Sequence, residues 1–115
     1  MTSRNVLVTV SEGEGSERGL EGIRAALGLA RGFEGHKVRV LFRGPAVQWM
    51  RAGNGAHVAA GAILMHLRAT VPMYVEAAAL EGTGMSRETL DASAHLAEPH
   101  EVTTLMEAAE ARLDF

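Results

Sequence analysis

Two side chains of opposite charge follow apolar segments that resemble strands, and together they could bind or process a small molecule. Arg43 comes directly after Lys37–Phe42, and Glu76 comes directly after Val71–Val75. Ligands of open parallel sheets bind beyond the carboxyl ends of the strands, so we expect both residues in one cleft. There Glu76 could act as a general base if burial raised its pKa, and Arg43 could anchor an anion. The alternative is a solvated Glu at a strand end, which is the more common case.

The same edge of the sheet would receive the loop that follows the first apolar segment. Asn5–Val10 leads into this loop, where the hydroxyl of Ser11 or backbone N–H groups could donate hydrogen bonds. Tyr74 lies beside the expected cleft, and its hydroxyl needs a partner if it is buried. No catalytic residue is assigned. The candidate ligand-binding residues are Ser11, Gly13, Gly15, Ser16, Arg43, Tyr74, Val75 and Glu76.

The glycines of the 11–16 loop resemble a phosphate-binding loop only superficially. The third glycine, Gly19, comes one place late for the GxGxxG spacing, and no Gly-Lys-Ser/Thr follows. Glu12, Glu14 and Glu17 would also repel a phosphate at close range. We therefore interpret this segment as a flexible turn and expect no nucleotide cofactor.

The histidines and the absence of cysteine argue against a metal centre. The five histidines form no HExxH motif and no close pair on one helical face. His95, Glu98, His100 and Glu101 could bind a divalent ion weakly, but Glu near the start of a helix is favoured without any metal. The chain has no cysteine, which removes disulfides, thiolate nucleophiles and sulfur-ligated metals together. We expect no metal and no cofactor.

The elements that would position these residues follow a β-α-β order. A crossover helix between strands favours a parallel sheet, because parallel strands need a long connection. Ser16 is a good N-cap for the first helix. The expected strands are Asn5–Val10, Lys37–Phe42 and Val71–Val75, and Arg112–Phe115 could add a final one. Helical spacing predicts helices over Leu20–Phe33, Ala56–Leu67 and Pro99–Ala109, with short helical pieces at Ala46–Met50, Ala77–Leu80 and Arg87–Leu90.

Apolar side chains outside the candidate site are expected in the core. The Ala56–Leu67 segment is apolar nearly all round, so it would lie in the core or at a subunit interface. Large apolar side chains at helical or strand positions are more often core than pocket lining. The residues placed in the core on this ground are Trp49, Met50, Met65, Met73 and Met85.

Composition and charge narrow the class of protein. The chain has 115 residues, of which 47% are hydrophobic, and this predicts a single domain over 1–115 with one core. The net charge is −3 without a run of Lys or Arg, which argues against nucleic-acid binding. The longest stretch without charged residues, Ala52–Leu67, contains glycines and histidines, so we expect no membrane span. With no secretion signal, the expected location is cytoplasmic.

Two segments resemble the DsrE/DsrF-like sulfur-relay family. They are Val71–Leu90, similar to the family's third strand and following turn, and Val102–Phe115, similar to its last helix and strand. The resemblance implies an α/β fold in three layers, a mainly parallel sheet of about five strands with helices on both faces. Active members carry a sulfur-accepting cysteine at the end of the third strand, which falls here at Val75 or Glu76. Neither residue can hold a persulfide.

Two hypotheses of function follow, and whether the protein is an enzyme stays open. The first is a non-thiol DsrE/DsrF-like binding or assembly subunit, for which the resemblance implies a homo-oligomer, a trimer or hexamer, with a possible protein partner in sulfur handling. The second is an enzyme or small-ligand binder that uses Glu76, Arg43 and the Ser11–Ser16 loop. A Glu76 buried beside Arg43 or a histidine would support the second, and an exposed, unpaired Glu76 would count against it.

Overall fold

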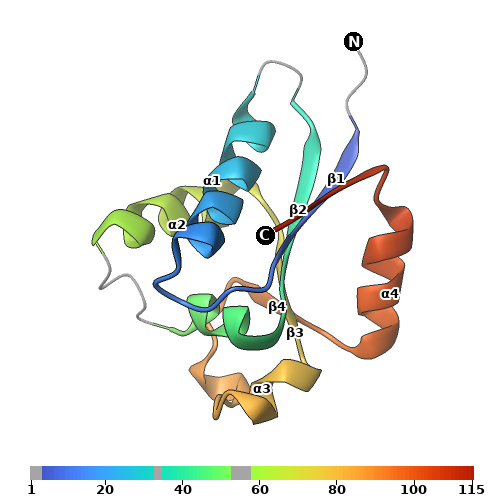
Figure 1. The fold of residues 1–115 in the computed structure, drawn as a ribbon. Helices are drawn as coiled ribbons and strands as arrows, with labels where there is room; N and C mark the ends of the chain where they lie inside the picture. Colours follow the sequence, from blue (N-terminus) through green and yellow to red (C-terminus); the bar gives the residue numbers. More distant parts are fainter. Residues whose placement is uncertain (1–3, 33–34, 53–57) are drawn as a thin grey trace.

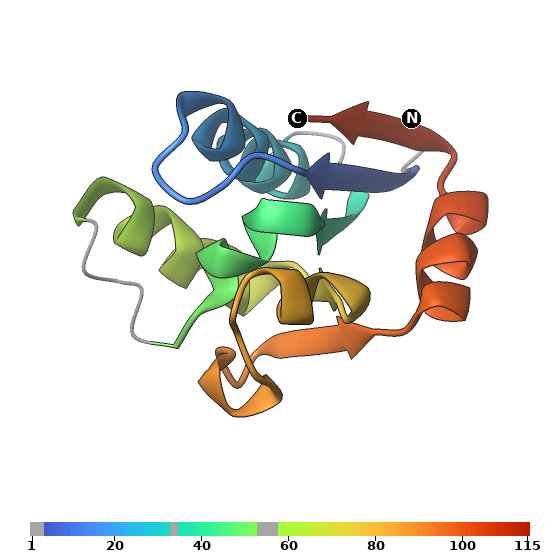
Figure 2. The ribbon, with the colours of Figure 1, turned by 60° about the horizontal axis from the view of Figure 1, so that its bottom comes forward.

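A parallel β-sheet organises the chain. The computed structural model describes residues 4–32, 35–52 and 58–115. Within these ranges the sheet has five strands in the order β4-β3-β2-β1-β5, so that β4 and β5 form its edges (Figure 2). Every neighbouring pair is parallel. The strands are β1 (Asn5–Val10), β2 (Lys37–Phe42), β3 (Met73–Glu76), β4 (Ala94–Ala97) and β5 (Ala111–Asp114).

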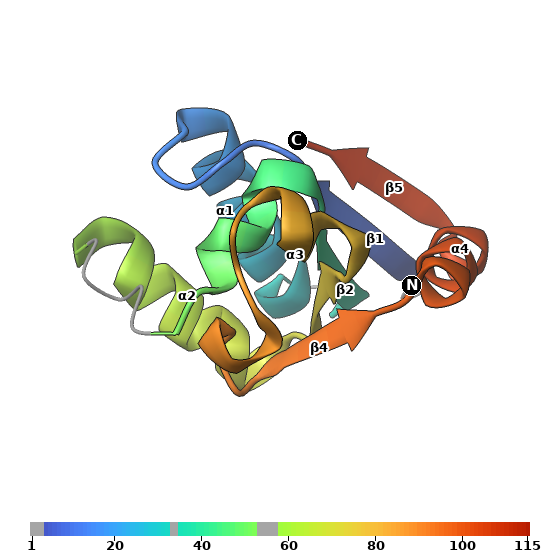
Figure 3. The same cartoon turned by 90° about the horizontal axis from the view of Figure 1, so that it is seen from below.

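Helices cover both faces of the sheet. The helices α1 (Glu17–Arg31) and α2 (Val58–Thr70) lie on one face, and α4 (Pro99–Ala108) lies on the other (Figure 1). The short helix α3 (Ala78–Gly82) and the 3₁₀ helix η1 (Gly44–Met50) lie over the carboxyl ends of the strands (Figure 3). A second 3₁₀ turn, η3 (Arg87–Thr89), precedes β4. The fold class implied by the family resemblance, α/β with a mainly parallel sheet of about five strands and helices on both faces, is confirmed.

Alternation along the strands divides the apolar side chains into two cores of unequal size. In β2, Val38, Val40 and Phe42 are buried in the larger core, which lies on the α1 and α2 side. Leu41 points the other way and joins a smaller core under α4. The buried members of that smaller core are Leu7, Leu41, Ala97 and Val102. Because the central strands are covered on both faces, they are nearly continuous apolar runs, as expected for a parallel sheet.

The sequence did not predict β4. Its residues, Ala94-His95-Leu96-Ala97, include no β-branched side chain, so the local signal for a strand is weak. The strand exists because it pairs along its whole length with β3. The last strand begins and ends one residue earlier than predicted, at Ala111–Asp114.

Two other expectations need correction. Met65, expected in the core, is 66% exposed on the outer side of α2, whereas Trp49, Met50, Met73 and Met85 are buried as predicted. The second helix is displaced from its predicted bounds to Val58–Thr70, and the start predicted for it at Ala56 lies outside the described residues. Phe33, the predicted end of the first helix, is also outside them, and α1 ends at Arg31.

None of the helices in the described ranges has the length and apolar character that a membrane span requires.

Close packing explains two of the glycines in α1. A Cβ added at Gly19 would lie 2.9 Å from the Trp49 indole nitrogen, and one at Gly22 would lie 2.9 Å from Cβ and Cγ of Phe115. At Gly28 an added Cβ would meet nothing within 4 Å. Glycine therefore lets η1 and the C-terminal residue approach α1 at two positions, and at the third it only lowers helix propensity.

We expect the Gly28→Ala variant to unfold at higher urea concentration than the wild type. An exposed helical Gly→Ala change removes unfolded-state entropy and is worth about 0.5 to 1 kcal/mol. Gly22→Ala makes the same chemical change against Phe115 and should be about 1 to 3 kcal/mol less stable than Gly28→Ala because of overpacking. Equal unfolding free energies for the two variants would contradict the packing at Gly22.

Candidate functional site

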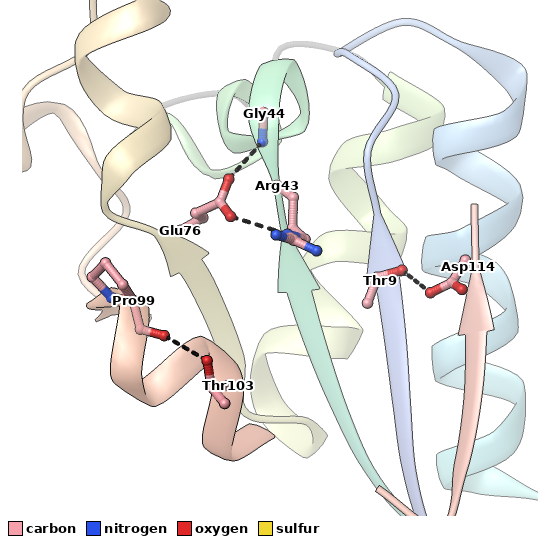
Figure 4. Close-up of polar contacts among 7 residues, drawn as sticks. All are labelled: Thr9, Arg43, Gly44, Glu76, Pro99, Thr103 and Asp114. Carbon is pink, nitrogen blue, oxygen red and sulfur yellow. Dashed lines mark hydrogen bonds and ion pairs between the residues drawn. The ribbon is translucent and has the colours of Figure 1, made fainter. Parts of the chain in front are cut away.

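The ion pair between Arg43 and Glu76 joins the carboxyl ends of β2 and β3. The Arg43 Nε lies 3.0 Å from Oε2 of Glu76, and the backbone N–H of Gly44 donates to Oε1 at 3.2 Å (Figure 4). The Glu76 side chain is 20% exposed and that of Arg43 is 38% exposed. The Gly44 backbone is in the left-handed region, with φ of 52°, which suits glycine. The structure thus brings together the two charged residues that the sequence placed in one cleft.

A small cavity adjoins this ion pair. It has a volume of about 260 Å³ and lies between the end of β3 and the first turns of α4. Its polar side chains are Arg43, Glu76 and Thr103, and the rest of its lining is apolar. The Thr103 hydroxyl already donates to the Pro99 carbonyl within α4, at 3.2 Å. Arg43, which has N–H groups beyond the Nε that contacts Glu76, is therefore the polar group best placed to contact a ligand there.

The geometry makes Glu76 a positioning group for Arg43. Both of its carboxylate oxygens accept hydrogen bonds from the protein. A general base must have an acceptor free to face a substrate proton, so the arrangement fits Glu76 less well for proton abstraction than for holding the guanidinium. Arg43 Nε is used by this contact, and its remaining N–H groups can still meet an anion.

A second polar contact joins two other neighbouring strands, β1 and β5. The buried Thr9 hydroxyl donates to Oδ1 of Asp114, joining β1 to β5 (Figure 4). This hydrogen bond, followed by those from Arg112, holds the pKa of Asp114 below its usual range, and the charge of Arg43 adds to the effect. Sequence reasoning missed Asp114, although a Thr inside an otherwise apolar strand was a signal that a polar partner lay opposite.

The Ser11–Ser16 loop does not line the Arg43 cavity. The Ser11 backbone N–H donates to the Phe115 carbonyl at 2.8 Å. Ser16 caps α1, as predicted, by accepting from Gly19 N at 2.9 Å. Trp49 of η1 donates to the Glu12 carbonyl at 2.9 Å, and a Cβ at Gly13 would touch Pro45. Gly15 takes a positive φ of 89°. The loop therefore rests on η1 and starts α1, and the residue before it, Val10, accepts a hydrogen bond from the Arg43 backbone N–H at 2.8 Å.

Tyr74 and Val75 lie apart from the Arg43 cavity. Val75 is fully buried in the larger core. Tyr74 faces α4, where its ring meets that of His95 edge to face, with 5.2 Å between ring centroids. Tyr74 lines a different cavity, which lies between α4 and the sheet. Of the two positions that the family resemblance suggested for a cysteine, only Glu76 presents its side chain to the cavity at the end of β3.

The acidic and histidine cluster near residue 100 connects β4 to α4. His95 Nε2 lies 3.0 Å from Oε2 of Glu101. Hydrogen bonding to His95 and to the Glu98 backbone lowers the pKa of Glu101. Glu98 and Glu101 form a capping box at the start of α4, as the helix-start interpretation predicted. Within the described residues no three His, Asp or Glu side chains gather closely enough to hold a metal ion.

Comparison with known proteins establishes the fold and goes no further. No family model matches the chain, and neither does any curated protein. The structure is similar to that of the YchN protein from E. coli, with a TM-score of 0.84 and 21% identity, covering 99% of this chain and 100% of the other. It is also similar to MTH1491, a protein of unknown function from Methanobacterium thermoautotrophicum, with a TM-score of 0.74 and 17% identity, covering 96% and 99%. Both have DsrE/DsrF-like folds, and this chain shares that fold.

The Thr9→Val variant should be destabilised by about 1 kcal/mol at neutral pH, since it keeps the shape of Thr9 and removes one hydrogen bond to a carboxylate. The pKa of Asp114 is depressed in the folded protein, so its contribution is complete above its unfolded value of about 3.9 and is lost as the pH falls through the folded value. The stability difference should therefore shrink in acid.

The measurement is urea unfolding at several pH values, together with an NMR titration of the Asp114 carboxyl. Thr9→Val should raise the pKa of Asp114 toward its ordinary value. Thr103→Val is the matched control, because that hydroxyl bonds only to the carbonyl of Pro99 in its own helix. An Asp114 pKa that stays the same in Thr9→Val would exclude this hydrogen bond as its cause.

Proposed function

We propose that this protein is a non-thiol DsrE/DsrF-like binding or assembly subunit, which works beside sulfur-handling partners that supply their own cysteines. One observation carries the proposal. Of the two positions where the family resemblance places the sulfur-accepting thiol, Val75 and Glu76, Glu76 ends β3 and faces the cavity, and its two oxygens are held by Arg43 and Gly44. A fixed carboxylate cannot accept a sulfane sulfur, but the charged cavity around it remains available for contact with an incoming group.

The surroundings of Glu76 are suited to stabilising an anion. A guanidinium and a backbone N–H converge on the carboxylate from β2 and η1. The same two donors would stabilise a thiolate placed there, because a neighbouring cation lowers a thiol pKa. A site that has these two donors and no thiol is what a subunit specialised for binding would show.

We expect Glu76→Cys to be more reactive than an ordinary surface thiol. Arg43 and the Gly44 N–H should lower the pKa of the new thiol below about 8.5, the value for a free cysteine. The control is Ala92→Cys, at an exposed position before β4. Incubation with inorganic polysulfide should add the mass of one sulfur atom to Glu76→Cys faster than to Ala92→Cys, and the wild type should stay unmodified.

Alkylation rates measured across a pH range give the two thiol pKa values directly. A Glu76→Cys thiol that titrates and reacts like Ala92→Cys would remove the link between this position and sulfur chemistry. The folding of both variants is checked first by circular dichroism and thermal unfolding, so that a difference in reactivity is not a difference in folding.

The assembly part of the proposal rests on the outer face of α2. Met65 is 66% exposed there, and Ala62 and Ala69, which are also exposed, lie one turn away on either side. No acidic residue occurs in the helix. A stripe of small and apolar side chains that faces outward from a helix favours contact with another protein surface, and we propose that it packs against another copy of this chain in a trimer or hexamer.

A second candidate, an enzyme or small-ligand binder, uses the cavity beside Arg43. The observation that favours it is that Glu76 is largely buried and paired with Arg43, as this hypothesis predicted. With a volume of about 260 Å³, the cavity is slightly below the usual range of small-molecule sites, which begins at about 300 Å³. For this reason the subunit proposal comes first.

Native mass spectrometry of the protein purified from its own host distinguishes the two. The wild type should be a trimer or hexamer, and Met65→Glu should dissociate because it places a charge in the α2 interface. Leu113→Glu, at an exposed large apolar residue on β5, should leave the subunit number unchanged. A monomeric wild type, or an oligomer that Met65→Glu does not affect, would overturn the α2 interface. An added small-molecule mass that Glu76→Gln loses would favour the second candidate.

A further inference from the structure

A larger cavity under α4 lies apart from the site discussed above. It has a volume of about 330 Å³, which is within the range of small-molecule sites. Three neighbouring strands and one helix provide its walls. The residues that line it are Arg39, Tyr74, His95, Glu101, Thr104, Leu105 and Ala108, and none of them lines the cavity beside Arg43.

The sheet register explains why these side chains gather. Tyr74 of β3 pairs with His95 of β4 and with Leu41 of β2. Arg39 is two residues before Leu41 and therefore shares its face of the sheet. On the helix, positions 101, 104, 105 and 108 follow the spacing of a single face. The cavity is thus a consequence of strand alternation and helical periodicity.

Arg39 brings a positive charge to this cavity, and within the described residues no carboxylate pairs with it. It is half-buried, and none of the described residues forms a hydrogen bond or ion pair with it. The arginines Arg43, Arg68 and Arg112 each pair with a carboxylate. A partly desolvated guanidinium favours a carboxylate or phosphate that it can bind through two parallel hydrogen bonds.

The rest of the cavity favours a flat and mainly apolar ligand body. The Tyr74 ring is held in place by its edge-to-face contact with His95. Leu105 and Ala108 provide apolar surface opposite. Within the described part of the chain no hydrogen-bond partner is found for the Tyr74 hydroxyl. Aromatic rings stack or meet edge to face with a gain beyond the area that they bury.

Glu101 does not prevent an anion from binding at Arg39. Its oxygens accept from His95 at 3.0 Å and from the Glu98 backbone N–H at 3.3 Å, and the N-terminal end of α4 offsets part of its charge. Arg39 and His95 are on strands separated by β3, so their backbones are about 10 Å apart, twice the spacing of neighbouring strands. Glu101 is therefore held on the β4 side of the cavity, two strands away from the backbone of Arg39.

We propose that this cavity binds a small aromatic carboxylate, with the carboxylate on the Arg39 guanidinium and the ring between Tyr74 and Leu105. This site is independent of the Arg43 and Glu76 site and needs no thiol or metal. Its specificity comes from the sign of the charge at Arg39 and from the flat space beside Tyr74.

The test is an NMR titration of the ¹⁵N-labelled protein with benzoate, with benzamide and benzylamine as neutral and cationic probes of similar shape. Benzoate should give saturable shifts of the amides around Arg39, Tyr74 and Leu105, with a dissociation constant of about 1 mM, typical of weak fragment binding. Benzamide and benzylamine should bind at least about tenfold more weakly, because they cannot accept the charge-assisted pair from Arg39.

Matched variants assign the effect to Arg39. Arg39→Gln should weaken benzoate binding about tenfold or more, and Arg39→Lys should keep part of the affinity because it retains the charge without the paired geometry. Arg24→Gln, at an exposed position on α1, should bind benzoate like the wild type. The amide spectrum of each variant reports its folding in the same experiment.

Any of four results would overturn the proposal. The first three are shifts that do not saturate, equal binding of benzoate and benzylamine, and benzoate shifts that survive in Arg39→Gln. Shifts centred on Arg43 and Gly44 would also overturn it, because they would move the carboxylate site to the smaller cavity and support the second candidate function.

Discussion

Strand alternation in a sheet that is covered on both faces decides where the chemically active side chains lie. Neighbouring residues of β3 point to opposite faces: Val75 enters the larger core, whereas Tyr74 and Glu76 face α4. A shift of one residue in register would bury a carboxylate in the larger core, at a cost of several kcal/mol. The apolar pattern thus fixes the sites as firmly as it fixes the fold. Both candidate cavities lie on the α4 side, where the core is smaller.

The polar contacts at the carboxyl ends of the strands contribute geometry more than stability. An ion pair as exposed as that of Arg43 and Glu76 is worth about 0 to 1 kcal/mol. By comparison, burying one large apolar side chain such as Phe42 contributes about 1.5 to 3 kcal/mol. The pair is therefore not what holds β2 to β3. Its effect is to fix the guanidinium beside the cavity, where a free arginine would sample many rotamers.

The sequence predicts this architecture well where the local pattern and the tertiary environment agree. The strands β1, β2 and β3 are apolar runs with clear ends, and the Ser16 cap is a local hydrogen bond, so both could be inferred before any contact was known. β4 could not be inferred, because its alanine-rich residues form a strand only by pairing with β3. Met65 is apolar, like most core residues, and its exposure becomes apparent only from the position of α2 in the fold.

The candidate site shows the same division. The contact between Arg43 and Glu76 could be predicted, because the carboxyl ends of parallel strands lie at the same edge of the sheet. The position of the 11–16 loop could not be predicted from this rule. The hydrogen bond from the Trp49 indole to the Glu12 carbonyl holds that loop against η1. No residue spacing in the sequence indicates this contact. Tyr74 and Asp114 likewise have partners far away in the chain, His95 and Thr9.

The helix α4 connects the two candidate sites. Positions 99, 102, 103 and 106 line the smaller cavity, and positions 101, 104, 105 and 108 line the larger one. One helix therefore presents two adjacent faces to two sites that share no residue. It is held to the sheet by the smaller of the two cores, to which it contributes the buried side chain of Val102. A layer held by few buried side chains is less costly to displace than the α1 and α2 layer, so a ligand that moved α4 at one cavity would change the shape of the other.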